Sequence, residues 1–382
     1  MEKQEIEPST IRRICQYAFS WLSLMYLASK KLDMEDNSLS FDPSGVGVQN
    51  GRFIGLPYTE QEARVVLQPV PWDVTVSFGE GTAGGPQNML DVSSQLDLED
   101  PRVPDAWKIG LFMRQPDAEL AALSAALRAD AKACISALES GHNPAEDESL
   151  TGKIQQVNRG GEYQKEWVRT RTAALMEKGK LVGLVGGDHS CPLGFLEALT
   201  ARHSSFGILQ IDAHMDLRKA YEGFTYSHAS IFRNALAYPE IAKLVQVGIR
   251  DYCREELDFA ASQGDRIEVF FDHDLQESRF VGETWHGICQ TIIAGLPKEV
   301  YLSVDIDGLN PSLCPNTGTP VPGGLTFDEA LHLGETIIQS GRIIIGFDLC
   351  EVAGAPHYWD GNVGARMLYR LSNLMASSQG LA

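Results

Sequence analysis

From Leu67 onward, short apolar runs alternate with longer segments in which apolar residues recur at helical spacing. The apolar runs predict strands at 67–72, 108–113, 181–186, 206–212, 243–249, 266–272, 300–306 and 342–348. The longer segments predict helices at 117–138, 162–178, 192–203, 229–238, 254–263, 282–296, 326–340 and 362–377. Nearly continuous apolar strands that alternate with helices are typical of a parallel sheet covered on both faces. We therefore expect one α/β domain over this part of the chain.

The first 66 residues lack this alternation. Pro8-Ser9-Thr10 predicts the start of an amphipathic helix that runs to about residue 29, and residues 31–66 are rich in loop-forming residues. An apolar run follows Arg12 and Arg13, but three acidic residues precede it and no small-residue cleavage site follows, which argues against a cleaved signal peptide. We interpret residues 1–66 as an N-terminal extension and residues 67–382 as the globular domain.

The overall charge narrows the class of partner. Lysine and arginine number 32 against 51 acidic residues, so the formal charge is -19, which disfavours nucleic acid and anionic membranes and suits a cationic small molecule. No apolar run reaches the roughly 18 residues of a membrane-spanning helix. The seven cysteines are scattered and form no C-x-x-C motif, which is typical of reduced thiols and predicts a cytoplasmic protein.

A glycine-rich segment follows the first predicted strand, with Gly79, Gly81, Gly84 and Gly85 close together. Its spacing matches neither the phosphate-binding P-loop nor the G-x-G-x-x-G dinucleotide motif. We therefore predict a loop at an active site or an interface rather than a nucleotide site.

The most informative stretch is Asp212-Ala213-His214-Met215-Asp216, which follows the apolar run 206–211. Alternate residues of a strand share one face, so the two carboxylates and the imidazole project the same way where the strand ends. This donor set suits Mn, Fe, Co, Ni or Zn. A solvated polar loop without a metal is the alternative for this stretch alone.

Three other predicted strands end in residues of the same kind. His189 follows the strand at 181–186, Asp305 and Asp307 end the strand at 300–306, and Glu351 follows the strand at 342–348. Because ligands gather at the carboxyl ends of parallel strands, these side chains are expected to meet. Four aspartates so close together would repel one another unless two divalent cations balanced them. Two cations roughly 3.5–4 Å apart can share a water molecule, lower its pKa and make a hydroxide nucleophile, which predicts two-metal hydrolysis.

Three motifs carry a resemblance to a known family. Gly186-Gly187-Asp188-His189-Ser190, Asp212-Ala213-His214-Met215-Asp216 and the segment 303–311 are similar to the signature motifs of the ureohydrolase (arginase/agmatinase) family, and 314–326 continues the third. The resemblance runs from about Leu67 to the C-terminus. It implies a three-layer α/β/α sandwich with a mostly parallel sheet, and it makes residues 67–382 a catalytic domain that cleaves a guanidino group to urea and an amine.

The same resemblance implies roles for individual residues. The metal ligands are His189, Asp212, Asp216 and Asp305 for one ion and Asp212, His214, Asp305 and Asp307 for the other, so that Asp212 and Asp305 bridge. His228 matches the proton-shuttling histidine, Glu351 matches the carboxylate that pairs with the guanidinium, and Thr319 matches a pocket threonine. Asn310 replaces a common aspartate, and 351–354 reads E-V-A-G in place of E-V-N-P; both departures lie outside the ligand set and bear on the substrate.

The substrate is narrowed by the residues after Asp216. Arg218 and Cys253 stand where arginases hold the amino-acid end of arginine with asparagine and aspartate, so arginine is disfavoured. The run 216–230, with the N-terminal extension, resembles the branch that contains the cyanobacterial guanidine hydrolases. Bulky aromatics at Tyr221, Phe224 and Tyr226 could close a tail channel, or they could be ordinary loop packing.

We therefore expect hydrolysis of free guanidine to urea and ammonia. The alternatives are an agmatinase, which converts agmatine to putrescine and urea, a hydrolase of another guanidino compound, and a non-catalytic binding or regulatory relative. The resemblance implies two divalent ions per subunit, with nickel favoured, although ligand chemistry alone leaves manganese open. It also suggests a homo-oligomer, a hexamer or a trimer, and metal-loading accessory proteins.

Overall fold

The computed structural model describes residues 41–381. The chain divides into two units, Met1–Pro43 and Ser44–Ala382, and every element below belongs to the second. The helix predicted for residues 10–29 therefore lies outside the described residues. The boundary at residue 66 stays a prediction, although the first strand already begins at Val65 and Phe53 is 1% exposed.

The second unit is built on eight parallel strands. Their bounds are β1 Val65–Val70, β2 Leu111–Met113, β3 Leu181–Gly186, β4 Phe206–Ile211, β5 Ile241–Ile249, β6 Ile267–Phe271, β7 Glu299–Asp305 and β8 Ile343–Cys350. They form one sheet in the order β2-β1-β3-β8-β7-β4-β5-β6, and every neighbouring pair is parallel. The predicted α/β class and parallel sheet are confirmed.

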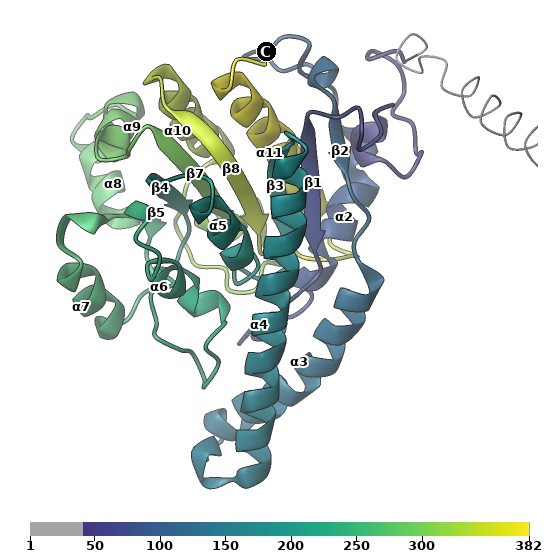
Figure 1. Ribbon diagram of the computed structural model, residues 1–382. Coiled ribbons are helices and arrows are strands. Elements are labelled where there is room, and N and C mark those ends of the chain that lie inside the picture. The colour runs from purple at the N-terminus through teal and green to yellow at the C-terminus, as the bar shows by residue number, and fades with distance from the viewer. Residues whose placement is uncertain (1–40, 382) are drawn as a thin grey trace, which may run out of the picture. The chain divides into compact units, whose positions relative to one another are not determined.

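Helices cover both faces of this sheet, so the three-layer sandwich is also confirmed (Figure 1). One face carries α2 Gly85–Val92, α9 Trp285–Ala294, α10 Phe327–Gln339 and α11 Tyr358–Ser378. The other carries α3 Ala118–Glu139, α4 Glu148–Glu177, α5 Leu193–Thr200, α6 Ile231–Ala235 and α7 Arg254–Ser262. The interior strands are apolar throughout because both of their faces are buried, and β1 and β4 have no exposed residue.

Some helix predictions were incomplete. The helices α2 and α8, Asp272–Phe280, were not predicted, because one begins inside the glycine-rich segment and the other is strongly polar. Helix α4 begins at Glu148 rather than near residue 162. Its first turns are polar and give little hydrophobic signal, but Asp147 caps them by accepting from the backbone N–H groups of Ser149 and Leu150.

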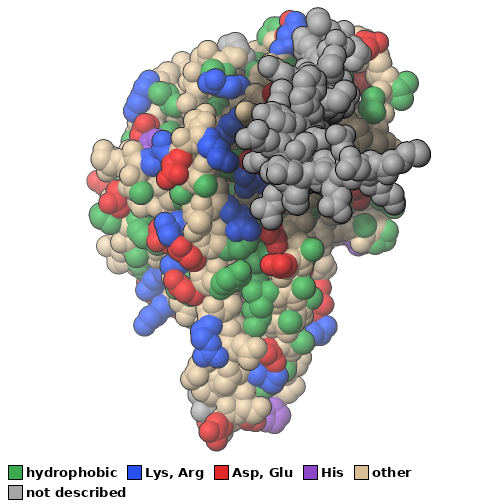
Figure 2. Space-filling view, turned by 45° about the vertical axis from the view of Figure 1, so that its right-hand side comes forward, with side chains coloured by type: hydrophobic (Ala, Val, Ile, Leu, Met, Phe, Trp, Pro, Cys, Tyr) green, Lys and Arg blue, Asp and Glu red, His purple; other side chains and the backbone are tan. Residues whose placement is uncertain are grey.

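The early start of α4 makes it part of a long hairpin with α3, which reaches beyond the sheet (Figure 1). The two helices approach each other closely at Gly160. A larger residue there would collide with Leu127 of α3, so the contact favours a small residue. On the molecular face of Figure 2, acidic and basic side chains are interspersed rather than gathered by sign. Within residues 41–381, no helix has the length and apolar character needed to cross a membrane.

Candidate metal centre

Strand order brings the predicted ligands together. The four strands that carry them, β3, β8, β7 and β4, are consecutive in the sheet. The register of the strands then aligns the ligands. Ile211 pairs with Val304, so the next residues, Asp212 and Asp305, lie side by side at the ends of adjacent strands. In the same way Asp305 pairs with Cys350, the residue before Glu351. Side chains that lie far apart in sequence therefore meet at one edge of the sheet.

Four of these residues form what we term the inner group: His189, Asp212, Asp216 and Asp305. The Nδ1 atom of His189 lies 2.9 Å from Asp212 Oδ2, 3.1 Å from Asp216 Oδ2 and 3.3 Å from Asp305 Oδ2. All four side chains are buried. One imidazole nitrogen thus faces three carboxylates in the protein interior.

Three residues form the outer group: Asp212, His214 and Asp307. The Nδ1 atom of His214 lies 3.1 Å from Asp307 Oδ2 and 3.5 Å from Asp212 Oδ1. Asp212 therefore offers one oxygen to each histidine, the arrangement that a bridging carboxylate needs. The His214 side chain is 23% exposed, whereas that of His189 is fully buried.

The donor set fits divalent cations. The Nδ1 atom of His189 is buried and makes no hydrogen bond among the described residues. Burial opposes its charge, but Asp212 and Asp216 outweigh that effect and raise the pKa of His189 well above its usual value. Burial, followed by the charge of Asp212, raises the pKa of Asp216 to about 7. Such mutual distortion of buried acids and bases is what two bound cations would relieve.

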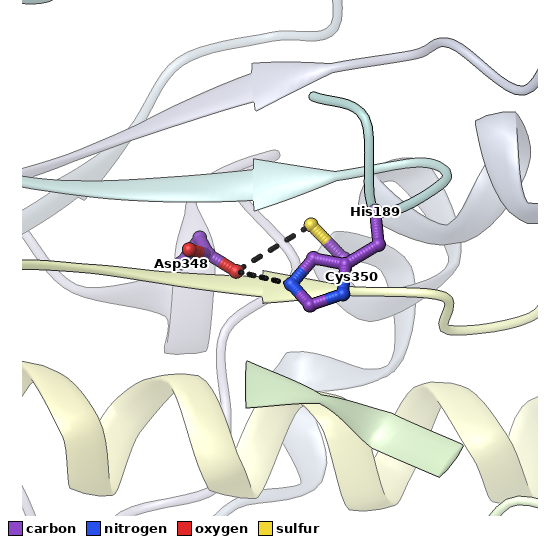
Figure 3. A group of neighbouring side chains, drawn as sticks. All are labelled: His189, Asp348 and Cys350. Carbon is purple, nitrogen blue, oxygen red and sulfur yellow. Dashed lines mark hydrogen bonds and ion pairs between the residues drawn. The ribbon is translucent and has the colours of Figure 1, made fainter. Parts of the chain in front are cut away.

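The second ring nitrogen of His189, Nε2, contacts two polar side chains on the side away from the other ligands. Its Nε2 atom lies 2.9 Å from Ser303 Oγ and 3.7 Å from Asp348 Oδ1, and Ser303 donates to Asp348 Oδ2 at 2.7 Å. Figure 3 shows the imidazole edge directed at Asp348, with the Cys350 thiol beside that carboxylate. By distance, His189, Asp348 and Cys350 could also hold an ion. We interpret them as a support instead, because a proton on Nε2 leaves Nδ1 free to bind a cation.

Sequence reasoning missed this supporting layer. Ser303 and Asp348 belong to it, and so does Gln210, which donates to Asp212 Oδ2 at 2.7 Å. Gln246 donates in turn to Gln210 Oε1 at 2.6 Å. Each of these residues is a buried polar position inside a mainly apolar strand. That pattern was the available signal, since a buried polar side chain needs a partner.

Glu351 lies beside the inner group, and its predicted role as the carboxylate that pairs with the guanidinium stays a prediction. Its Oε1 atom accepts from the backbone N–H of His189 at 3.0 Å, while Oε2 is buried without a partner among the described residues. Burial, then the charge of Asp188, raises the pKa of Glu351 well above its usual value. Glu351 (φ 63°) and Asp216 (φ 54°) both adopt the left-handed backbone region, a strain that is common at functional sites.

A cavity of about 130 Å³ opens in front of the outer group. Its lining includes the predicted site residues His214, Asp216, His228 and Thr319, but not Glu351. Thr319 Oγ1 donates to Asp307 Oδ2 at 3.3 Å. Burial, followed by the charges of His214 and His189, lowers the pKa of His228, so its imidazole is neutral near pH 7.

Three further residues form the mouth of this cavity: Arg218, Tyr221 and Tyr252. The Arg218 guanidinium carbon lies 4.7 Å from the centre of the Tyr221 ring, and that ring meets His228 edge to face at 6.0 Å. The sequence left open whether three aromatics close a channel or pack within the loop, and of the three only Tyr221 lines the cavity. Phe224 is 1% exposed within the core, and Tyr226 packs on α4, where its hydroxyl donates to Glu162.

Helix α4 also fixes the loop that carries these residues. Asn158 donates to the carbonyl of Gly223 at 3.1 Å and accepts from the N–H of Thr225 at 2.8 Å. A side chain at Gly161 would collide with Tyr226 at 2.7 Å, so only glycine permits this close approach. The length of α4 therefore has a direct bearing on the cavity mouth.

The glycine-rich segment lies against the same region. The N–H of Gly79 donates to Gly318 at 2.9 Å, next to Thr319, and the carbonyl of Gly81 accepts from Gly354 at 3.1 Å. A Cβ at Gly79 would lie 2.7 Å from the Gly318 carbonyl oxygen. The segment thus packs against two loops of the site, as an active-site loop does.

Comparison with known proteins agrees with this geometry. Residues 63–372 match the family described as the arginase family. The chain belongs to the arginase family. Its fold is accordingly arginase-like, and the similarity covers the whole of the sheet and all the predicted site residues.

Two curated relatives of this arginase-family chain have ureohydrolase names. N(1)-aminopropylagmatine ureohydrolase of Thermus thermophilus is 29% identical over 327 residues, which span 85% of this chain and 94% of the relative. Agmatinase of Bacillus subtilis is 28% identical and spans 77% of this chain and 84% of the relative. Neither is named as a guanidine hydrolase.

Solved structures show the same fold. Agmatine ureohydrolase of Thermoplasma volcanium has a TM-score of 0.65 at 20% identity, covering 87% of this chain and 97% of that one. The crystal structure of Trypanosoma cruzi formiminoglutamase with Mn2+ has a TM-score of 0.62 at 17% identity, covering 85% and 98%. The arginase-family chain is therefore a metal-dependent ureohydrolase of guanidino compounds with a binuclear divalent-metal site.

Proposed function

We propose that the protein hydrolyses free guanidine to urea and ammonia. The observation that carries this choice is the cation of Arg218, which lies against Tyr221 at the mouth of a cavity of about 130 Å³. A second cation about 5 Å from that guanidinium would cost roughly 1–3 kcal/mol, according to how well water screens the pair, before the Glu256 carboxylate, 4.0 Å from Arg218 Nε, offsets part of it. Agmatine carries such a second cation at the end of its tail, and free guanidinium has none.

The reaction needs a nucleophile, a proton carrier and a hold on the substrate. The inner and outer groups would hold two divalent cations, which would lower the pKa of a water molecule and so provide the nucleophile. His228 lines the cavity beside His214, and its neutral imidazole takes the proton of that water and passes it to the departing ammonia. Thr319 offers a hydroxyl at the same wall, and Asp216 offers a carboxylate.

Glu351 has a less direct role in this proposal than the resemblance implies. Its carboxylate holds the backbone of His189 and lies outside the cavity lining. Its unpartnered Oε2 atom lies beside Gly318, where a side chain would come within 3.2 Å of it. This oxygen is enclosed, so a small planar cation that moves past Thr319 and displaces the wall beside Gly318 would pair with it and give Glu351 both a positioning and a substrate-binding role.

A tailed guanidino compound such as agmatine is the second candidate. The names of the relatives favour it, because they specify agmatine and N(1)-aminopropylagmatine. One feature of the cavity favours it as well: Asp251, which is 69% exposed, and Glu256 line the mouth beside Arg218. Their carboxylates would attract the distal ammonium that Arg218 repels.

The identity of the metal is a separate part of the proposal. Manganese is the ion of the formiminoglutamase structure, which shares this fold. Nickel rests on the family resemblance alone, and the oxygen and imidazole ligands accept either ion. Assembly as a hexamer or a trimer, and loading by accessory proteins, stay predictions.

The test is urea release by protein loaded with manganese or with nickel. Guanidine, agmatine, N(1)-aminopropylagmatine and arginine are compared by kcat/KM. Guanidine is expected to give the highest value, and faster turnover of agmatine would overturn the choice of substrate. Metal-loaded protein that is inert on all four would instead favour the non-catalytic relative.

Arg218→Asn sharpens the test. Removing the cation should raise kcat/KM for agmatine relative to guanidine by about tenfold, as expected for a change of 1–2 kcal/mol. The matched control is Arg233→Asn, because Arg233 also stacks on an aromatic ring, that of Phe259, but lies outside the cavity lining. An equal change in both variants would mean that Arg218 does not select the substrate.

A further inference from the structure

Two histidines outside the catalytic site bring ring nitrogens together on the helices α9 and α10. The Nδ1 atom of His286 lies 3.1 Å from Nε2 of His332, and the ring centres are 5.3 Å apart. His286 is exposed, and the His332 side chain is 31% exposed. Both nitrogens can therefore be reached from solvent.

The pair is held in place by the packing of the two helices. The indole N–H of Trp285, the residue before His286, donates to the carbonyl of Glu329 at 3.1 Å. Glu329 lies one turn before His332, and its carboxylate binds Arg279 at 2.6 Å. These contacts fix the start of α9 against α10, so the short distance between the imidazoles follows from the fold rather than from two free side chains.

Each imidazole has a polar neighbour at its outer nitrogen. Gln290 lies 3.1 Å from Nε2 of His286, and Glu335 Oε2 lies 3.8 Å from Nδ1 of His332. The Glu335 carboxylate favours a proton on Nδ1 of His332 and so leaves its inner Nε2 with a lone pair. The Gln290 amide group instead donates to Nε2 of His286, so the proton of His286 lies on its inner Nδ1 and donates to His332. The Glu335 carboxylate thus resembles the supports that orient metal-binding histidines.

The distance between the inner nitrogens also suits a shared ion. Two nitrogens bound to one cation at 2.0–2.1 Å lie roughly 2.9–3.4 Å apart when they occupy neighbouring coordination positions. Binding of a cation would require the inner proton of His286 to leave Nδ1 for Nε2 or for solvent, after which both inner nitrogens could bind the same ion. We propose that His286 and His332 form a surface chelate for a first-row transition-metal dication such as Ni²⁺, with water as the remaining ligands.

This site is separate from the catalytic centre and does not depend on the choice of substrate. It joins α9 to α10, so an ion bound there should stabilise the folded chain against unfolding. The test is a calorimetric titration with Ni²⁺ of the untagged enzyme, whose catalytic ions are already in place. We expect one further ion per chain, together with a rise in Tm as the site fills.

His286→Ala and His332→Ala should each weaken the added binding by at least about tenfold, because one of only two protein ligands is lost. Urea release should not change in either variant. The control is His273→Ala, since His273 is also exposed on a helix but pairs with the Asp274 carboxylate, at 2.9 Å, and not with a second imidazole. Absence of a further ion in the wild type, or equal binding by all the variants, would overturn the proposal.

Discussion

The inner and outer groups share Asp212 but differ in how they are built. The inner histidine is fully buried, and Ser303 and Asp348 hold its second nitrogen. The outer histidine is 23% exposed, and its second nitrogen faces only Asp251, at 4.0 Å. Because supporting residues and exclusion of water both raise metal affinity, the inner cation should be held more tightly than the outer one. The centre thus combines the inner group, a buried half that holds its cation tightly, with the outer group, an open half that faces the cavity.

The strongest test of this division is removal of the residue that both halves share. Asp212→Ala should reduce metal content and urea release to background, because each histidine loses its bridging partner and the remaining carboxylates repel. Asp305→Ala should act in the same way. Metal analysis and the urea assay check both results, with Asp251→Ala as the exposed control. Metal retained in Asp212→Ala would show that Asp212 does not bridge.

His228 tests whether the open half contributes chemistry apart from the ions. His228→Ala should slow turnover by about 10²-fold or more while both cations stay bound, as expected for a lost general acid and base. Steady-state kinetics and metal analysis on the same sample separate the two effects. Unchanged kcat would remove His228 from the mechanism, and loss of metal would make it a structural residue instead.

Ser303 and Asp348, which hold the second nitrogen of His189, should affect the affinity for the inner cation but not for the outer one. Ser303→Ala or Asp348→Asn should weaken the inner cation by about 10–100-fold, because nothing then fixes the proton on Nε2. Competition with a chelator measures each ion in turn. The matched variant in the outer half is Asp251→Asn, which should leave the inner affinity unchanged. Equal weakening of both ions by Ser303→Ala would mean that the two halves are not independent.

The smallest expected effect is on the free energy of unfolding, and it comes from Glu222 in the loop beside the outer group. Burial, followed by the charge of Glu139, raises the pKa of Glu222 to about 7. A carboxyl group with a raised folded pKa loses stability as the pH climbs from its unfolded value towards 7, since the native state must then bury the charge. Glu222→Gln should therefore raise the free energy of unfolding by about 1 kcal/mol at pH 8 and by nothing at pH 4. Denaturant melts at both values check this, and an equal gain at pH 4 would contradict it.

The same two halves explain what could be predicted from the sequence. The strands that carry the ligands are apolar runs with fixed periodicity, so the pattern alone places His189, Asp212 and Asp305 at one edge of the sheet. The residues at the cavity mouth were harder to predict than the metal ligands, because loop residues have no periodic pattern. Tyr221, Phe224 and Tyr226 look alike in sequence, and only tertiary contacts with α4 and the core show that Tyr221 alone lines the cavity. The role of Glu351 as a substrate-binding carboxylate stays a prediction, and the sequence does not show that its left-handed backbone turns the side chain towards His189.

The contact between α4 and the loop at the cavity mouth has a kinetic consequence. Asn158 binds the loop at two points, and Gly161 brings the helix against Tyr226. A loop anchored in this way is expected to act as a fixed opening rather than as a lid, so substrate exchange should need no slow movement of this segment. The width and charge of the opening should then set the rates at which substrate enters and urea leaves. Helix α4, whose first half lies outside the sheet layers, would thus influence turnover through two hydrogen bonds of Asn158.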